Sequence, residues 1–213
     1  MKTKCDIEVV TGFIGSGKTL FINGLVQCTL VKNEKVVIIS CEKGNSNISE
    51  DILNNKNIVF YECNNYEVKR EYIKQIIQKH NPNRIIIEYN GTRLLDNMLS
   101  IIYSNELKKL CKITTIFFTI DAKTFDMYIN NMGNFLIPFI KFSNLIVITN
   151  TKGVTHLECI NMEEKLRKIN NYAHIITINN MNNIIRNLEK YDLLDAGLLK
   201  QIRIHLKNFI SRI

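Results

Sequence analysis

The sequence predicts an α/β protein whose doubly wound, mostly parallel sheet is flanked by helices. Strand-like and helix-like apolar periods alternate along the whole chain, as they do in such folds. The runs 36–39 and 85–87 are continuously apolar, which is typical of strands buried on both faces. A glycine-rich loop joins the first predicted strand to the first predicted helix. With 213 residues, the chain suits one α/β domain and needs no second one.

The predicted elements follow one another in strand–helix order. Strands are expected at 7–10, 36–39, 58–61, 84–88, 113–120, 145–149 and 175–178. Helices are expected at 20–30, 66–80, 94–110, 125–140 and 157–169, followed by a helical tail from 181 to the end. The helix at 125–140 should be broken near Gly133 and Pro138. We expect one domain over residues 1–190 and a C-terminal helical tail over residues 191–213.

The C-terminal tail carries apolar side chains at helical spacing. They are Leu194, Leu198, Ile202, Leu206 and Phe209, whereas Lys200, Arg203 and Lys207 lie off this stripe. Because such a stripe normally faces apolar neighbours, we expect the tail to pack on the domain or to form a dimer contact. A basic amphipathic helix also suits an anionic membrane surface, which is the less favoured alternative.

Bulk composition disfavours several classes of function. No run approaches the roughly 20 apolar residues that span a bilayer. Asp6 and Glu8 interrupt any signal-peptide core near the N-terminus, so we expect a cytoplasmic protein. The net charge of +8 comes from lysines spread along the chain, which disfavours nucleic-acid binding. The six cysteines form no C-x-x-C or C-x-C motif, and the histidines are scattered, so no metal cluster is predicted.

One motif points to phosphate binding. Residues 11–19, TGFIGSGKT, fit G-x-x-x-x-G-K-[ST] and lie between a predicted strand and a predicted helix. Its glycines let the backbone approach phosphates closely, and successive N–H groups form an anion nest at the helix N-terminus. The motif assigns Lys18 to the β- and γ-phosphates and the Thr19 hydroxyl to Mg²⁺. The expected nucleotide contacts are Gly12, Gly15, Ser16, Gly17, Lys18, Thr19 and Leu20.

Polar residues just past other predicted strands fall at the same edge of the sheet. Ligands of such sheets bind at the carboxyl ends of the strands, where Glu42, Glu88 and Asn150 are expected. Glu88 ends an apolar strand, where P-loop enzymes place a carboxylate near Mg²⁺. The expected metal contacts are therefore Thr19, Glu42 and Glu88, the expected catalytic residues are Lys18 and Glu88, and Asn150 is expected at the base. The alternative for both glutamates is a solvated surface charge.

Three stretches carry a resemblance to a known family. The run TGFIGSGKT at 11–19 resembles the P-loop of the CobW-like metal-chaperone GTPases, relatives of the nickel chaperones UreG and HypB. Residues 41–44, CEKG, are similar to that family's Asn-Glu-Phe-Gly loop, and 86–91, IIEYNG, to its Ile-Glu-Thr-Ser-Gly Walker B segment. The likeness covers roughly residues 5–180. It implies a P-loop NTPase fold that binds Mg²⁺ with GTP or another purine nucleotide.

The chain departs from the family pattern at two motifs. The family's C-x-C-C metal motif falls on residues 62–65, ECNN, where only Cys63 is a thiol. Without ligands from another chain, we expect no tight zinc or nickel site there, because such sites need several thiolate or imidazole ligands. The guanine-reading Asn-Lys-x-Asp motif falls on residues 150–153, NTKG, which lack the carboxylate. We therefore expect reduced discrimination between guanine and adenine, with GDP still preferred.

The favoured interpretation is an Mg²⁺-dependent GTP-binding protein and slow GTPase that assists metal or cofactor loading by a protein client. A homodimer is the other expected protein partner. The first alternative is a regulatory module that binds nucleotide with little hydrolysis, and the degenerate motifs favour it. A small-molecule kinase is the second alternative, but it needs a lid with several arginines, and arginines are sparse here.

Overall fold

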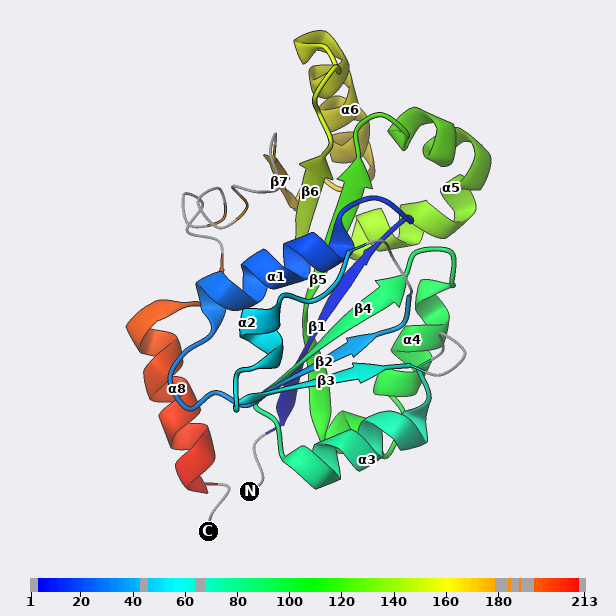
Figure 1. The fold of residues 1–213 in the computed structure, drawn as a ribbon. Helices are drawn as coiled ribbons and strands as arrows, with labels where there is room; N and C mark the ends of the chain where they lie inside the picture. Colours follow the sequence, from blue (N-terminus) through cyan, green and yellow to red (C-terminus); the bar gives the residue numbers. More distant parts are fainter. Residues whose placement is uncertain are drawn as a thin grey trace.

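Seven parallel strands form one sheet in the order β3-β2-β4-β1-β5-β6-β7 (Figure 1). The computed structural model describes residues 4–42, 46–63, 68–178, 184, 188 and 194–210. The strands are β1 (Cys5–Gly12), β2 (Val36–Ser40), β3 (Ile58–Glu62), β4 (Arg84–Asn90), β5 (Cys111–Asp121), β6 (Leu145–Thr149) and β7 (His174–Thr177). The predicted parallel α/β sheet is confirmed, because all seven predicted strands are present and pair in parallel.

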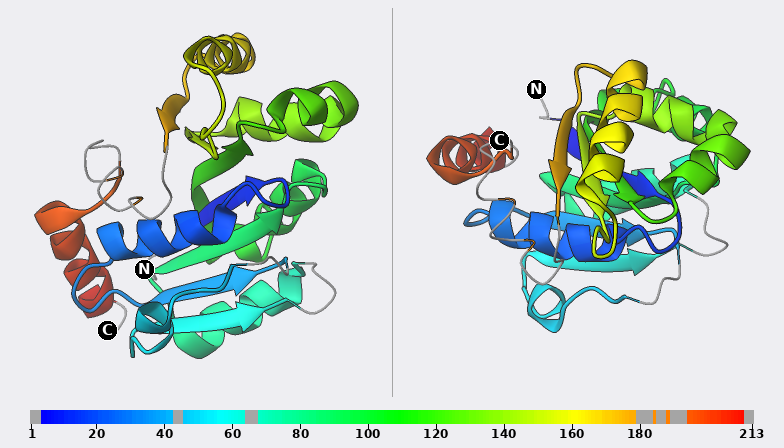
Figure 2. Two further views of the ribbon diagram at one scale, coloured as in Figure 1. Left: turned by 45° about the horizontal axis from the view of Figure 1, so that its top comes forward. Right: turned by 90° about the horizontal axis from the view of Figure 1, so that it is seen from above.

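Helices cover both faces of the sheet (Figure 2). They are α1 (Lys18–Thr29), α2 (Glu50–Leu53), α3 (Arg70–His80), α4 (Leu95–Ile102), α5 (Phe125–Phe142), α6 (His156–Ile169) and α8 (Gly197–Ile210). Apolar residues of α3, α4, α5 and α6 pack on one face, and those of α1 and α2 pack on the other. Among the described residues, no helix is both long enough and apolar enough to cross a bilayer.

Three elements differ from the sequence prediction. The helix expected at 94–110 ends at Ile102, and a 3₁₀ turn (Leu107–Lys109) follows it. The short helix α2 was not predicted, because four residues carry too little periodicity to detect. Helix α5 is interrupted at Met132, next to Gly133, but it continues through Pro138. Several residues of the predicted tail between 179 and 193 lie outside the described residues.

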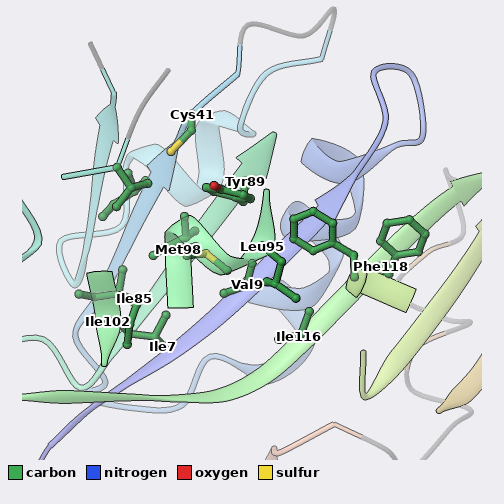
Figure 3. Packing of buried hydrophobic residues seen from close by; sticks show 14 of the residues in the cluster. Ile7, Val9, Cys41, Ile85, Tyr89, Leu95, Met98, Ile102, Ile116 and Phe118 are labelled. Carbon is green, nitrogen blue, oxygen red and sulfur yellow. The ribbon is translucent and has the colours of Figure 1, made fainter. Parts of the chain in front are cut away.

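The strands bury both of their faces, as their continuous apolar runs indicate. Along β2 and β4, neighbouring residues alternate between the two core clusters: Val37, Ile39 and Ile85 face one side, whereas Ile38 and Ile86 face the other. The cluster on the α3–α6 side reaches the carboxyl ends of the strands, where Cys41, Tyr89 and Phe118 belong to it (Figure 3). The closely packed core therefore extends to the polar strand ends and fixes their positions.

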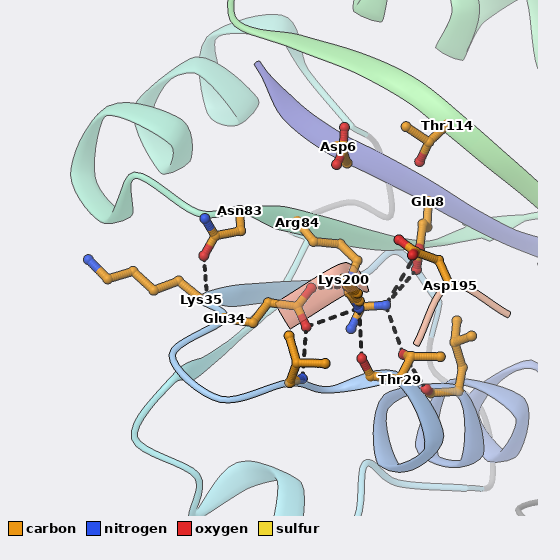
Figure 4. Close-up of polar contacts among 12 residues, drawn as sticks. Asp6, Glu8, Thr29, Glu34, Lys35, Asn83, Arg84, Thr114, Asp195 and Lys200 are labelled. Carbon is orange, nitrogen blue, oxygen red and sulfur yellow. Dashed lines mark hydrogen bonds and ion pairs between the residues drawn. The ribbon is translucent and has the colours of Figure 1, made fainter. Parts of the chain in front are cut away.

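Helix α8 is held to the domain by buried ion pairs near the amino ends of β1 and β4, away from the carboxyl ends of the strands (Figure 4). Lys200 Nζ lies 3.0 Å from Glu34 Oε2 and donates to the Thr29 carbonyl at 2.7 Å. Arg84 contacts the other oxygen of Glu34 through Nε at 3.1 Å and Glu8 Oε2 through NH1 at 3.2 Å. Lys200 was expected to lie off the packed stripe, yet it is 2% exposed. The anchor of α8 is therefore charged.

We expect Glu34→Gln to destabilise the protein far more than Lys200→Met. Among the described contacts, Glu34 is the carboxylate that Lys200 and Arg84 share, so its loss leaves Lys200 without a contacting acid and Arg84 with Glu8 alone. Breaking a buried ion pair by removing one partner costs about 3–5 kcal/mol. Lys200→Met leaves Glu34 paired with Arg84, and it also removes a charge whose pKa is lowered by burial. Urea denaturation of the two variants tests this expectation. Equal losses of unfolding free energy would contradict it.

Candidate nucleotide-binding site

The glycine-rich loop joins β1 directly to α1. Strand β1 ends at Gly12, and α1 begins at Lys18. A Cβ atom at Gly12 would lie 2.3 Å from the Thr119 carbonyl oxygen, so only glycine fits this close approach. Gly17 caps the N-terminus of α1 in the left-handed conformation, with a φ of 81°. The backbone N–H groups of the loop therefore meet the positive end of a 12-residue helix.

Neighbouring elements hold the loop in shape. The Ser16 hydroxyl donates to the Phe13 carbonyl at 2.7 Å, within the loop, and shares a 2.7 Å hydrogen bond with Thr119 of β5. The Thr149 hydroxyl at the end of β6 donates to the Ser16 carbonyl at 3.1 Å. The Phe13 ring stacks on Tyr128 of α5, with 4.0 Å between the ring centroids. A loop fixed on three sides loses little entropy when it binds a ligand.

Lys18 lies buried at the head of α1 among oxygen acceptors. Its Nζ donates to the carbonyls of Gly12 at 2.9 Å and Phe13 at 2.7 Å, and it lies 2.9 Å from Glu42 Oε2. The two charged side chains are only 4% and 7% exposed. The structure therefore pairs Glu42, which we expected near the metal, with the phosphate-binding lysine.

Thr19 and Glu88 meet beside Lys18 and form a set of oxygen ligands. The Thr19 hydroxyl donates to Glu88 Oε1 at 2.6 Å, and the Ser40 hydroxyl donates to Glu88 Oε2 at 2.5 Å. The sequence analysis did not identify Ser40, although it is the residue of β2 that pairs with Glu88 in the sheet register. A buried hydroxyl next to a carboxylate suits Mg²⁺, which prefers oxygen ligands and uses few protein carboxylates.

A cavity of about 510 Å³ opens beside these oxygen ligands. Its lining includes Thr19, Ser40, Glu42 and Glu88, together with Phe60 and Glu62 of β3. With Glu50, four carboxylates line the cavity and give this side of the site a negative potential, so an anionic nucleotide needs a cation there. The arrangement in which phosphates lie over the loop and Mg²⁺ lies next to Thr19 stays a prediction.

Asn150 lies at the other side of the loop, where the base is expected. Its Nδ2 donates to Asp121 Oδ2 at 2.7 Å and to the Gly15 carbonyl at 3.4 Å. Turning the amide over would place its oxygen against the Asp121 carboxylate, so Asp121 fixes its orientation. The sequence analysis placed Asn150 at the base but did not identify Asp121 as its partner. Gly153 has open space around it and supplies no side chain.

Two thiols lie together near the site. Cys41 and Cys63 follow the last paired residues of β2 and β3, and the Cys63 N–H donates to the Ser40 carbonyl at 2.8 Å. The neighbouring thiol and burial raise the pKa of Cys41, whereas its interaction with Cys41 lowers the pKa of Cys63. The sequence analysis considered Cys63 as a single thiol and did not place Cys41 beside it. No third ligand joins them, because the described residues contain no group of three acidic, histidine or cysteine side chains placed to hold a metal.

Together, the fold and the site define a P-loop nucleotide-binding protein. The glycine loop, its buried lysine and the hydroxyl–carboxylate pair occupy the strand–loop–helix positions that this class requires. The chain belongs to the CobW/HypB/UreG family, because residues 6–177 match the model of that family's nucleotide-binding domain. The resemblance seen in the sequence is thereby confirmed. Residues 43, 44, 64 and 65, which belong to two of the motifs compared above, lie outside the described residues.

Solved structures of other proteins share this fold. The chain is 20% identical to the Zn(II)-bound YjiA GTPase from E. coli, with a TM-score of 0.61, and covers 83% of its own length and 58% of that chain. HypB from Archaeoglobus fulgidus is 15% identical, with a TM-score of 0.54 and coverages of 88% and 89%. HypB from Helicobacter pylori in complex with nickel is 13% identical, with a TM-score of 0.54 and coverages of 97% and 85%. No curated protein matches the chain.

Proposed function

We propose that the protein binds a purine nucleoside triphosphate, preferably GTP, together with Mg²⁺, and hydrolyses it slowly. The convergence of Lys18, Thr19 and Glu88 around the glycine loop carries this proposal. The loop N–H groups and Lys18 bind the phosphates. The Thr19 hydroxyl and Glu88 hold the metal, whose chemistry is to neutralise charge on the β- and γ-phosphates. Membership in a family of nucleotide-binding domains supports the same assignment.

Glu88 is the residue to which we assign the water-positioning role. It is 3% exposed, and both of its oxygens accept hydroxyl hydrogen bonds, so its carboxylate is held in one orientation. A fixed carboxylate beside the metal can orient a water for attack on the γ-phosphate. Glu42 acts at an earlier step in this scheme. It releases Lys18 to the phosphates, and the loop that carries Glu42 then responds to the presence of the nucleotide.

We further propose that a protein client accelerates the reaction and receives a metal or cofactor in return. Enzymes of this mechanism that work without a partner turn over as slowly as about 10⁻⁴ per second, because charge neutralisation is incomplete. The described part of the site contains Lys18 as its cation at the phosphates, and no arginine contacts the loop there. The similar structures with zinc or nickel, YjiA and HypB, suggest a client that carries a metal.

One observation favours the regulatory alternative. Lys18 and Glu42 form a buried ion pair, so an internal carboxylate competes with phosphate oxygens for the lysine. A module of this kind would signal by occupancy alone and would need little hydrolysis.

Calorimetry and single-turnover hydrolysis separate the two functions. The purified protein is titrated with GTP in the presence of Mg²⁺ and then in the presence of a chelator, and the nucleotide that copurifies is identified by chromatography. We expect Mg²⁺-dependent binding and slow phosphate release above the rate of a Lys18→Ala control. Binding without phosphate release above that control would support the regulatory module. Transfer of phosphate to an added small molecule would support a kinase, and absence of binding would contradict the proposed function.

We expect the protein to prefer GDP to ADP, but by less than about 3 kcal/mol, the upper end for a hydrogen bond to a charged group. Gly153, which has no side chain, stands where relatives read guanine with a carboxylate, so adenine leaves no charge unpaired. Competition between the two diphosphates at fixed Mg²⁺ and salt measures the gap. Asp121→Ala should narrow the difference between the GDP and ADP affinities, because the Asn150 side-chain amide can then rotate to suit either base. A preference above roughly a thousandfold would show that a carboxylate reads guanine.

A further inference from the structure

Helix α8 is turned with its apolar side outward. Leu198 and Leu199 are 78% and 83% exposed, and Ile202, Leu206 and Phe209 are 57%, 55% and 61% exposed. Ile210, at 42%, completes this surface, which we call the outer face of α8. Only Lys200 and Ile204, on the opposite side of the helix, are buried. A contiguous apolar surface on one helix is a usual mark of an interface.

Polar contacts fix this orientation of the helix. Besides Lys200, Lys207 Nζ contacts Asp6 Oδ2 at 2.6 Å, and Asn208 donates to the Asn33 carbonyl at 2.9 Å. Asn83 in turn donates to Asn208 Oδ1 at 2.8 Å. Rotating α8 to bury its apolar stripe would break the buried ion pair between Lys200 and Glu34, which is energetically costly. The outer face is therefore a stable feature of the fold.

The charges around the outer face argue against a membrane surface as its partner. Helix α8 contains no acidic residue, but its lysines and arginine are already paired. Lys200 contacts Glu34, Lys207 contacts Asp6, and Arg203 contacts Asp195. An amphipathic helix that binds anionic lipid presents its basic side chains to the headgroups on either side of the apolar face. Here those side chains are turned toward the protein's own carboxylates, which leaves an apolar surface with little net charge.

The outer face is complementary to a second copy of itself. If two α8 helices pack antiparallel about the level of Ile204, Ile202 of one copy lies opposite Leu206 of the other. In the same register Leu198 meets Ile210 and Leu199 meets Phe209, so every apolar side chain of the face meets another. With roughly 150–200 Å² for each side chain, the exposed surface of these six residues amounts to at most about 560–750 Å² per partner, which places the contact at the small end of specific interfaces.

We propose that the outer face of α8 is the contact surface of a symmetric dimer, in which the α8 helices of two copies pack antiparallel. This inference does not depend on the nucleotide chemistry. The residues that anchor α8, such as Asp6 and Arg84, lie at the start of β1 and β4, whereas the glycine loop follows the end of β1 (Figure 1). The dimer therefore leaves both nucleotide sites open, and changes in the outer face should leave nucleotide binding intact.

Sedimentation velocity of the full chain tests the dimer and its register. We expect a dimer for the wild type and monomers for Ile202→Glu and for Leu206→Lys, because each puts a charge into the apolar contact. A mixture of these two variants should form a heterodimer, since the new carboxylate of one chain lies opposite the new ammonium of the other. Leu157→Glu, at a 66% exposed apolar position on α6, is the matched control and should remain dimeric.

Each other outcome counts against the proposal. Circular dichroism and GTP titration show first that the variants fold and bind nucleotide like the wild type. A wild type that is monomeric at micromolar concentration, or an Ile202→Glu variant that is still dimeric, would overturn the proposed contact. Failure of the mixed variants to associate would overturn the antiparallel register. A monomeric wild type that sediments with phosphatidylglycerol vesicles, when Ile202→Glu does not, would assign the outer face to a lipid surface instead.

Discussion

Lys18→Ala should abolish tight binding of GTP, with a loss of about 1.5–3 kcal/mol for each charge-assisted phosphate contact. The Lys18 ammonium is buried at the head of α1, and alanine offers no cation in its place for the β- and γ-phosphates. Calorimetric titration of GTP and ATP with Mg²⁺ measures the effect. Equal titrations for the wild type and the variant would show that the glycine loop binds no phosphate.

The ion pair with Glu42 makes a control necessary. Lys18→Ala leaves the Glu42 carboxylate 7% exposed and without its cation, which destabilises the fold in its own right. The double variant Lys18→Ala with Glu42→Gln removes that charge. We expect the double variant to recover much of the lost thermal stability and still fail to bind nucleotide. If it binds GTP as the wild type does, the loss in the single variant comes from Glu42 and not from a missing phosphate contact.

Glu88→Gln should slow hydrolysis by about 10²–10³-fold while it weakens GTP binding by less than tenfold. The amide keeps the size of the carboxylate and can still meet the Thr19 and Ser40 hydroxyls, so the fold and the phosphate nest stay intact. It lacks the negative charge that holds the metal and orients water. Single-turnover hydrolysis and calorimetry on the same preparation separate the two effects.

Glu42→Gln is the matched control for that experiment. It removes a buried carboxylate from the same cavity, but one that contacts Lys18 and not the Thr19 hydroxyl. We expect a smaller effect on the hydrolysis rate, together with tighter triphosphate binding, because Lys18 no longer has a competing anion. An unchanged single-turnover rate in Glu88→Gln would count decisively against its assigned role, whatever Glu42→Gln shows.

The sequence by itself determined the class of fold and the nature of the main site. Buried parallel strands must be apolar on both faces, so runs such as 36–39 and 85–87 were recognisable without a structure. The glycine loop was recognisable because its residues follow one another at fixed spacing, and Gly17 is required by the left-handed conformation at its own position. The need for glycine at position 12 comes from Thr119 of the neighbouring strand, which only the structure shows. The two glutamates were found by the same route, because a carboxylate that ends a strand lies at the ligand-binding edge of a parallel sheet.

Only the tertiary structure decided which of these side chains meet. Strands β2, β4 and β1 are neighbours in space but not in sequence, and this order places Ser40 next to Glu88. The same holds for Asp121 beside Asn150 and for Glu42 against Lys18. The orientation of α8 was likewise beyond sequence analysis. Its apolar stripe favours burial, but a buried lysine satisfied by Glu34 outweighs that preference, and the acid is 166 residues away in the chain, a separation that local patterns do not span.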